Sequence, residues 1–152
     1  MQPELRNLLD HFDEHCLVIR SFYVWATIFP EAKQSTSFGK GHAFTPKKKR
    51  AYLKKLAELL KQSVDFEKIC GTVRLTILYS FPWRNEDKPL RSLGWIFMSE
   101  RPDIDNLQKP LLDSLQKFCL ADDAQVVEVK ARKIRTSEPC IVVRIDEIRP
   151  AR

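Results

Sequence analysis

The strongest constraint on how this chain folds is the run from Val73 to Phe81, in which an apolar side chain occupies every second position. Successive side chains of an extended strand point to opposite faces, so this spacing predicts a strand with one continuous apolar face. The other face carries Arg74, Thr76, Leu78 and Ser80. An apolar sheet face must be buried against a second layer, and the rest of the chain therefore has to supply that layer.

Two segments have the helical spacing that a covering layer needs. The Thr45-Pro46 pair, an N-cap followed by proline, predicts a helix that ends near Ser63, with leucines on one side and lysines on the other. Residues 106–118 predict a second helix with its leucines facing inward. Pro110 removes one backbone hydrogen bond from this helix, so we expect a kink there, or a restart with Lys109 as N-cap.

The remaining segments complete the order of elements. Strands are expected in three further segments, residues 16–26, 126–132 and 141–145. In the second of these, Val127, Val129 and Ala131 should point inward. Less regular segments are a short strand over 95–98, a loop or loose hairpin over 33–44, and a charged loop over 82–93. This order predicts an α+β (mixed α/β) fold, a single sheet of about four to five strands with helices packed on it. We expect one domain over residues 1–152, with 1–15 as an N-terminal helical extension.

The chain is basic, with a formal net charge of +6, and its charges are segregated. Basic residues dominate between Lys33 and Lys61, whereas acidic residues concentrate between Glu100 and Glu128. The segregation favours a polyanionic partner and a separate cation-binding pocket. A lysine-rich helix face exposed to solvent explains the basic run equally well.

No part of the sequence indicates a membrane or an oxidising compartment. No apolar run approaches the ~20 residues needed to span a bilayer, and the first residues lack the layout of a signal peptide. We expect a cytoplasmic protein whose scattered cysteines are reduced thiols. These cysteines are Cys16, Cys70, Cys119 and Cys140.

An acidic cluster within a basic protein needs a physical reason. Its members are Asp103, Asp105, Asp113, Asp122 and Asp123. Carboxylates that are brought together repel one another unless a cation shares the site, and Mg²⁺ suits hard oxygen ligands. Asp103 and Asp105 at a turn entering a helix can form half of such a site, and Asp123 can complete it. Lys109, four residues after Asp105, can hold that carboxylate or reach a phosphate. A Mg²⁺ site within a basic surface suggests phosphodiester chemistry on nucleic acid.

Simpler roles account for each acidic motif taken alone. Asp103 or Asp105 can be a helix cap, and Asp122-Asp123 can be a turn. An EF-hand loop starting at Asp103 is excluded, because glycine and glutamate are required where the chain has Gln108 and Ser114. A phosphate-binding glycine loop is excluded as well, because the four glycines are not suitably spaced.

Taken together, the motifs resemble one known family, the RusA-type Holliday-junction resolvases that are common in prophages. The family pattern is Asp-x-Asp-Asn-Leu-x-Lys, then Asp-x-Leu, then Asp-Asp-x-Gln-Val, and the matching stretches begin at Asp103, Asp113 and Asp122. Upstream, residues 32–48 are similar to the family's basic loop leading to Thr-Pro-Lys-Lys at a helix. The matches cover roughly residues 28–147 in the same order.

The resemblance implies a homodimeric, Mg²⁺-dependent endonuclease that resolves four-way DNA junctions by paired nicks in recombination and repair, with Mn²⁺ able to replace Mg²⁺. By position, it implies Asp103, Asp105 and Asp123 as catalytic metal ligands, with Lys109 as the supporting catalytic lysine. A four-way junction is two-fold symmetric, which suits a dimer with one site per subunit. The expected contacts to DNA phosphates are Lys33, Lys40, Lys47, Lys48, Lys49, Arg50, Lys54 and Arg101.

The chain departs from the family pattern at two places, and two competing functions stay open. Ser35-Thr36-Ser37 stands where relatives often carry an Arg-Pro-Arg-like segment, and Pro102 stands where some carry a basic residue. The competitors are a nuclease for flaps, forks or other branched DNA, and a non-catalytic dimer that binds junctions. The spacing of His11, His15 and Cys16 allows a metal site, but an exposed helix face explains it better.

Overall fold

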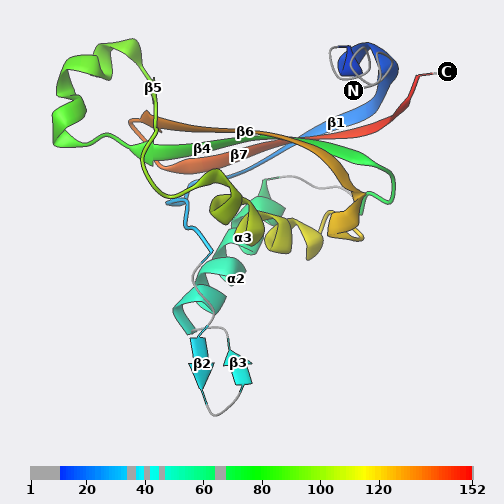
Figure 1. Cartoon of the computed structure of the whole chain (residues 1–152), viewed down its shortest axis with the longest axis horizontal. Helices are drawn as coiled ribbons and strands as arrows, with labels where there is room; N and C mark the ends of the chain where they lie inside the picture. The colour runs from blue at the N-terminus through cyan, green and yellow to red at the C-terminus, as the bar shows by residue number, and fades with distance from the viewer. Residues whose placement is uncertain (1–10, 34–36, 40–41, 45–46, 64–67, 152) are drawn as a thin grey trace, which may run out of the picture.

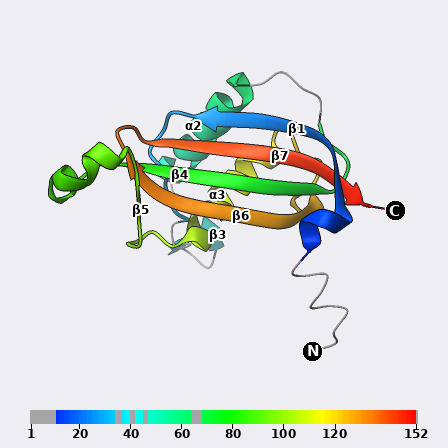
Figure 2. The same cartoon turned by 90° about the horizontal axis from the view of Figure 1, so that it is seen from above.

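The structure, a computed structural model of the chain, describes residues 11–33, 37–39, 42–44, 47–63 and 68–151. Its centre is a five-stranded sheet with the strand order β1-β7-β4-β6-β5 (Figure 2). The strands are β1 (Cys16–Ala26), β4 (Val73–Pro82), β5 (Ile96–Phe97), β6 (Val126–Thr136) and β7 (Cys140–Pro150). Every segment that the sequence predicts as a strand therefore contains one.

The two long helices, α2 (Lys47–Gln62) and α3 (Ile104–Gln116), cover the same face of the sheet (Figure 1). This arrangement confirms the predicted α+β fold, a single sheet with helices packed on it. A small antiparallel pair of strands, β2 (Ser37–Gly39) and β3 (His42–Phe44), precedes α2. Of the loop and the loose hairpin that were both expected for residues 33–44, the hairpin is therefore the correct alternative. The predicted helix start at Thr45-Pro46 lies outside the described residues.

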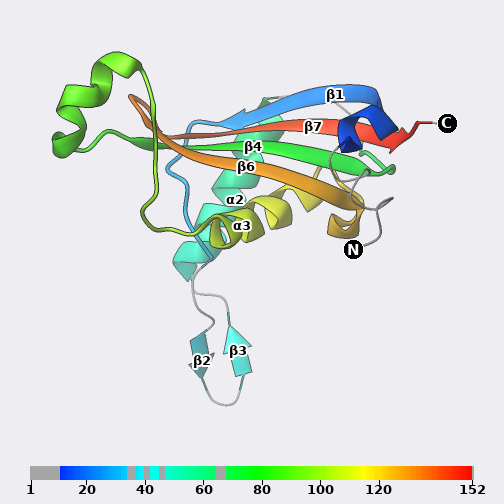
Figure 3. The ribbon, with the colours of Figure 1, turned by 45° about the horizontal axis from the view of Figure 1, so that its top comes forward.

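β4 and β6 are parallel, whereas every other neighbouring pair in this sheet is antiparallel. Parallel neighbours require a long crossover. Here the crossover carries the 3₁₀ helix η2 (Asn85–Leu93), then β5, α3 and the short 3₁₀ helix η3 (Asp123–Gln125). α3 therefore runs back along the sheet between the end of β4 and the start of β6 (Figure 3). All of the predicted catalytic residues lie in this crossover.

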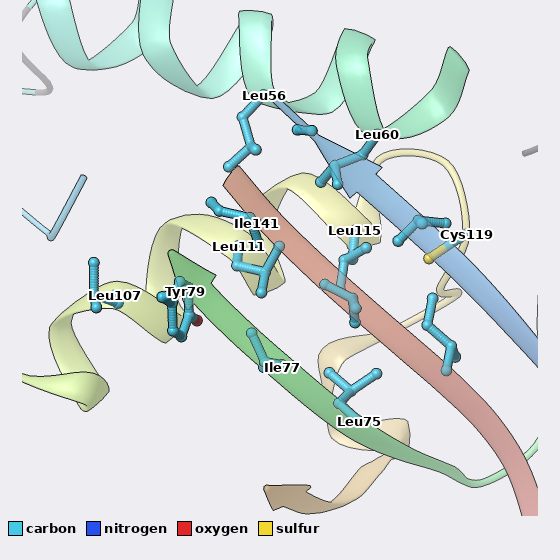
Figure 4. Packing of buried hydrophobic residues seen from close by; sticks show 14 of the residues in the cluster. Leu56, Leu60, Leu75, Ile77, Tyr79, Leu107, Leu111, Leu115, Cys119 and Ile141 are labelled. Carbon is cyan, nitrogen blue, oxygen red and sulfur yellow. The ribbon is translucent and has the colours of Figure 1, made fainter. Parts of the chain in front are cut away.

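The helix-covered face forms the core and has the alternation that the sequence predicts. Leu75, Ile77 and Tyr79 of β4 are at most 1% exposed. They pack with buried leucines of both helices, namely Leu56, Leu60, Leu107, Leu111 and Leu115 (Figure 4). Burying a leucine side chain contributes roughly 1.5–3 kcal/mol, so several such contacts hold α3 firmly on the sheet.

The predicted inward direction of Val127 is wrong. β6 places Val126 and Glu128 opposite consecutive residues of β4, so the register shifts at Val127. An extra residue in one strand of a pair changes which side chains face the core. Val127 is 57% exposed, whereas Val126 packs against the core together with Val129 and Ala131.

Two further expectations need correction. The segment expected to be an irregular loop contains η2. α3 runs through Pro110 as one helix, so the predicted restart at Lys109 is wrong.

Only the end of the predicted N-terminal helix is described, and Phe12–His15 form the 3₁₀ helix η1 there. The four cysteines are free thiols, as predicted. In the described part of the chain, no helix is both long and apolar enough to cross a bilayer.

Candidate active site

The crossover brings two carboxylates to the start of α3. Asp103 is the N-cap residue and Asp105 lies in the first turn, where the helix dipole stabilises negative charge. The Asp103 side chain accepts no capping hydrogen bond, so the alternative role as a side-chain cap is not observed. Both residues are exposed, and neither carboxylate has a hydrogen bond or ion pair with another described residue.

Pro110 shapes α3 without breaking it. Proline lacks the N–H that would otherwise bond to the carbonyl oxygen of Asn106, four residues earlier. That oxygen instead accepts a hydrogen bond of 2.6 Å from the backbone amide of Lys33. The segment that follows β1 is thereby attached to the first turns of α3.

Lys109 connects α3 with the turn that precedes β6. Its ammonium nitrogen lies 3.0 Å from a carboxylate oxygen of Asp113 and 3.9 Å from one of Asp123. The hydrogen bond and charge of Asp113, with a smaller contribution from Asp123, raise the pKa of Lys109 above its usual value. Asp105 lies one turn earlier on the same side of the helix. Pro110, the next residue, does not prevent Lys109 from reaching the acidic cluster.

The two adjacent aspartates after α3 have different roles. The Asp122 carboxylate accepts a hydrogen bond of 2.8 Å from the backbone amide of Ala124 and caps η3. The turn role suggested for the pair is therefore correct for Asp122. Asp123 faces Lys109 instead, and its side chain is 44% exposed. Of the two carboxylates, that of Asp123 is the one placed beside the lysine.

Gln125 holds this turn in place, a role that periodicity and charge did not indicate. Its side-chain oxygen accepts hydrogen bonds from the amides of Ala121 and Asp122, at 2.7 and 2.9 Å. Its side-chain nitrogen donates to the carbonyl oxygens of Ile69 and Gly71, at 2.9 and 2.8 Å. These bonds tie the start of β6 to the segment that enters β4. The available signal was its fixed place in the Asp-Asp-x-Gln-Val motif.

The donor set suits a hard divalent cation such as Mg²⁺, which takes one or two carboxylates and retains several waters. Asp103 and Asp105 supply two carboxylates that no described residue engages, and Asp123 supplies a third from η3. In the described ranges, no three His, Cys, Asp or Glu side chains converge closely enough to hold a metal ion. The structure thus brings Asp123 to Lys109, but it does not gather the three carboxylates into one ligand group.

A cavity of about 470 Å³ adjoins the start of α3. It is lined by residues 29–33, by Lys48 of α2, and by Pro102, which directly precedes Asp103. Lys33 and Lys48 therefore share this cavity with the residue that precedes the first predicted ligand. Among the other predicted DNA contacts that the structure describes, Lys49 is partly buried. The rest are exposed, namely Lys47, Arg50, Lys54 and Arg101. Lys40 lies outside the described residues.

Residues 27–146 match the family described as Endodeoxyribonuclease RusA. The chain belongs to this family. The RusA match begins directly after β1 and ends within β7, so it contains both long helices and the whole crossover. The predicted catalytic residues all lie inside it. As a RusA-family member, the chain is an endodeoxyribonuclease and therefore a hydrolase.

Two relatives show how far the similarity extends. The uncharacterized protein YqaN of Bacillus subtilis (strain 168) is 28% identical over 116 residues, which cover 72% of this chain and 82% of YqaN. The crossover junction endodeoxyribonuclease rusA of Lactococcus phage r1t is 36% identical over 55 residues, which cover 36% of this chain and 42% of the phage protein.

Proposed function

We propose that this RusA-family chain is a divalent-metal-dependent endonuclease that resolves four-way DNA junctions by paired, symmetric nicks. The observation that carries the proposal is the arrangement of the crossover. Two exposed aspartates stand at the start of α3, and the Lys109–Asp123 pair follows on the same helix and the turn after it. Carboxylate ligands beside a lysine, in a basic protein, are the groups that phosphodiester hydrolysis with a bound cation requires.

Asp103, Asp105 and Asp123 would hold Mg²⁺, or Mn²⁺ in its place. The bound ion would lower the pKa of a water molecule and polarise the scissile phosphate. Lys109 contributes a positive charge near the reacting phosphate, where it offsets the negative charge that develops during cleavage. Asp113 orients this lysine through the 3.0 Å contact and favours its charged form.

The basic residues of α2 and the cavity wall would contact DNA through backbone phosphates. Such contacts position the DNA but carry no sequence information, which suits an enzyme that recognises the shape of its substrate. Lys33 and Lys48 line the cavity beside Pro102, so a phosphate held there would lie close to the start of α3. Arg101 adds a further exposed charge in the same loop.

Paired nicks require two sites with a fixed separation. A two-fold homodimer supplies one site to each of two symmetry-related strands of a junction. The proposal therefore includes a dimer as the active form. Equal cleavage of both strands, rather than independent single nicks, is its functional signature.

Cleavage of a synthetic four-way junction in Mg²⁺ tests the proposal. We expect symmetric nicks from the wild type and a loss of at least about 100-fold in rate for Asp105→Asn, since one charged ligand is removed. Glu138→Gln is the matched control, because it makes the same carboxylate-to-amide change in an exposed turn far along the chain. This variant should cut like the wild type.

The remaining outcomes distinguish the competing functions. Unchanged cleavage by Asp105→Asn would overturn the assignment of the site. Faster cutting of a flap or fork than of the junction would favour a broader nuclease for branched DNA. Tight junction binding without nicks in either Mg²⁺ or Mn²⁺ would favour a non-catalytic binding protein.

A further inference from the structure

A lysine of β6 holds the loop that delivers Asp103 to the candidate site. The ammonium nitrogen of Lys133 donates hydrogen bonds to the carbonyl oxygens of Glu100 and Pro102, at 2.6 and 2.8 Å. The second of these oxygens belongs to the peptide group that joins Pro102 to Asp103. The side chain therefore fixes the backbone immediately before the first predicted metal ligand.

The strand register explains why Lys133 reaches this loop. It lies opposite Tyr79 of β4, whose buried side chain belongs to the helix-covered face. Its neighbours Lys130 and Arg132 lie opposite Thr76 and Leu78, on the other face of the sheet. Lys133 is partly buried, and no described carboxylate forms an ion pair with it. Its charge is thus directed at backbone carbonyls.

The same loop has additional anchors at its start. The backbone amide of Met98 donates to the carbonyl oxygen of Lys133 at 3.0 Å. The Glu100 carboxylate lies 2.7 Å from Arg84 and 3.7 Å from Arg135. Between Glu100 and the start of α3, by contrast, the hydrogen bond from Lys133 to Pro102 is the described side-chain contact that restrains the backbone.

We propose that Lys133 is a positioning residue for the carboxylate of Asp103, an inference that rests on the proposed metal-dependent cleavage. Hydrogen bonds from a charged donor are stronger and shorter than neutral ones, so they define the loop more tightly. Loss of Lys133 would leave two carbonyl oxygens without this donor and allow Asp103 to shift. A misplacement of about 1 Å in an active site can lower a rate by about 100-fold.

The test compares Lys133→Met with wild type in three measurements on the full chain: Mn²⁺ affinity of the DNA-free protein by electron paramagnetic resonance, junction affinity in EDTA, and single-turnover cleavage in Mg²⁺. We expect Mn²⁺ affinity to fall several-fold and cleavage to fall about 10- to 100-fold. Junction affinity should change by less than about two-fold, because Lys133 reaches into the loop rather than out to DNA. Lys133→Arg, which keeps charged donors, should recover part of both losses.

Lys130→Met is the matched control. Lys130 is on the same strand and carries the same charge, but it pairs with Asp13 and Glu128 on the opposite face. This variant should bind Mn²⁺ and cleave like the wild type. If Lys133→Met matched the wild type in both Mn²⁺ affinity and cleavage, the inference would be overturned.

Two further results distinguish a purely structural lysine from a wrongly assigned substrate. A lower thermal midpoint with equal losses of junction affinity and cleavage, not recovered by arginine, would show that Lys133 only stabilises the fold and would also overturn the inference. If the wild type cut no junction, but Lys133→Met still weakened Mn²⁺ binding, the proposed substrate would be wrong while the positioning role stood.

Discussion

The backbone amide of Lys33 donates a hydrogen bond to the carbonyl oxygen of Asn106, 2.6 Å away, at the point where Pro110 leaves that oxygen without its usual helix partner. The bond joins a predicted DNA-binding residue to the helix that begins at two of the predicted metal ligands, Asp103 and Asp105. A proline inside a helix normally weakens it. Here the proline creates an acceptor that links two parts of the site.

Pro110→Ala should loosen this link. Alanine restores an N–H that competes for the Asn106 oxygen, so the amide of Lys33 should exchange its hydrogen faster with solvent. We expect weaker junction binding, by a few-fold, while α3 itself stays folded because alanine favours helix. Hydrogen exchange resolved by residue, with junction affinity in EDTA, measures both effects. Unchanged exchange at Lys33 would show that the oxygen serves both donors.

Asp122 and Asp123 should separate stability from catalysis. Asp122→Ala removes the cap of η3 and should cost about 1 kcal/mol of unfolding free energy, with only a modest loss of cleavage. Asp123→Asn keeps the turn but loses the charge beside Lys109, so it should cleave at least about 100-fold more slowly at nearly wild-type stability. Denaturant unfolding and single-turnover cleavage of both variants check this. If Asp122→Ala abolished cleavage and Asp123→Asn mainly lowered stability, Asp122 would be the catalytic residue and Asp123 the structural one.

Asp87 should make η2 sensitive to acid. The backbone hydrogen bond from Arg84 lowers the pKa of the Asp87 carboxyl below its usual value of 3.8, with help from the Arg84 and Arg135 charges. Because the pKa is lower in the folded state, the stabilisation is complete above the unfolded pKa and disappears as the pH falls through the folded one.

The stability of Asp87→Asn should therefore lie below that of the wild type at neutral pH and approach it in acid. Denaturant unfolding over a series of pH values measures the difference. The exposed neighbour Glu86, changed to Gln, is the control and should show a small difference at neutral pH. If the difference in unfolding free energy between Asp87→Asn and the wild type stayed constant into strong acid, the prediction would be contradicted.

Gln125→Glu should destabilise the protein strongly for a single-atom change. The carboxylate would lose both donors to Ile69 and Gly71 and would place negative charge against their carbonyl oxygens. Removing partners from buried polar groups costs about 1–3 kcal/mol. Thermal and denaturant unfolding measure the loss. Gln62→Glu at the exposed end of α2 is the control and should change stability far less.

Features that depend on local periodicity could be predicted from the sequence. The alternation of β4 and the leucine spacing of α3 define their buried faces, because each pattern repeats with the geometry of its own element. Val127 could not be placed in this way. Its direction depends on the register between β6 and β4, which involves residues far apart in the chain.

The same distinction between local and long-range features applies to the candidate site. The positions of Asp103 and Asp105 at a helix start follow from the local sequence. The different roles of Asp122 and Asp123 do not, because they depend on which carboxylate meets an amide and which meets Lys109. The hydrogen bonds of Lys133 cannot be predicted from the sequence either, because its two acceptors are backbone carbonyl oxygens of a loop about 30 residues earlier in the chain.

β1 lies outside the stretch that matches the RusA family, yet it pairs with β7 along nearly its whole length. Without β1, the apolar strand β7 would become the margin of the sheet, with a row of free amides and carbonyls open to another chain. Such margins promote aggregation, and a β-bulge is one of the devices that blunts them. β1 has an irregularity of this kind between Val18 and Arg20. A nuclease shortened to the matched residues would therefore tend to form irregular intermolecular sheets, because β1 is the segment that covers the edge of β7.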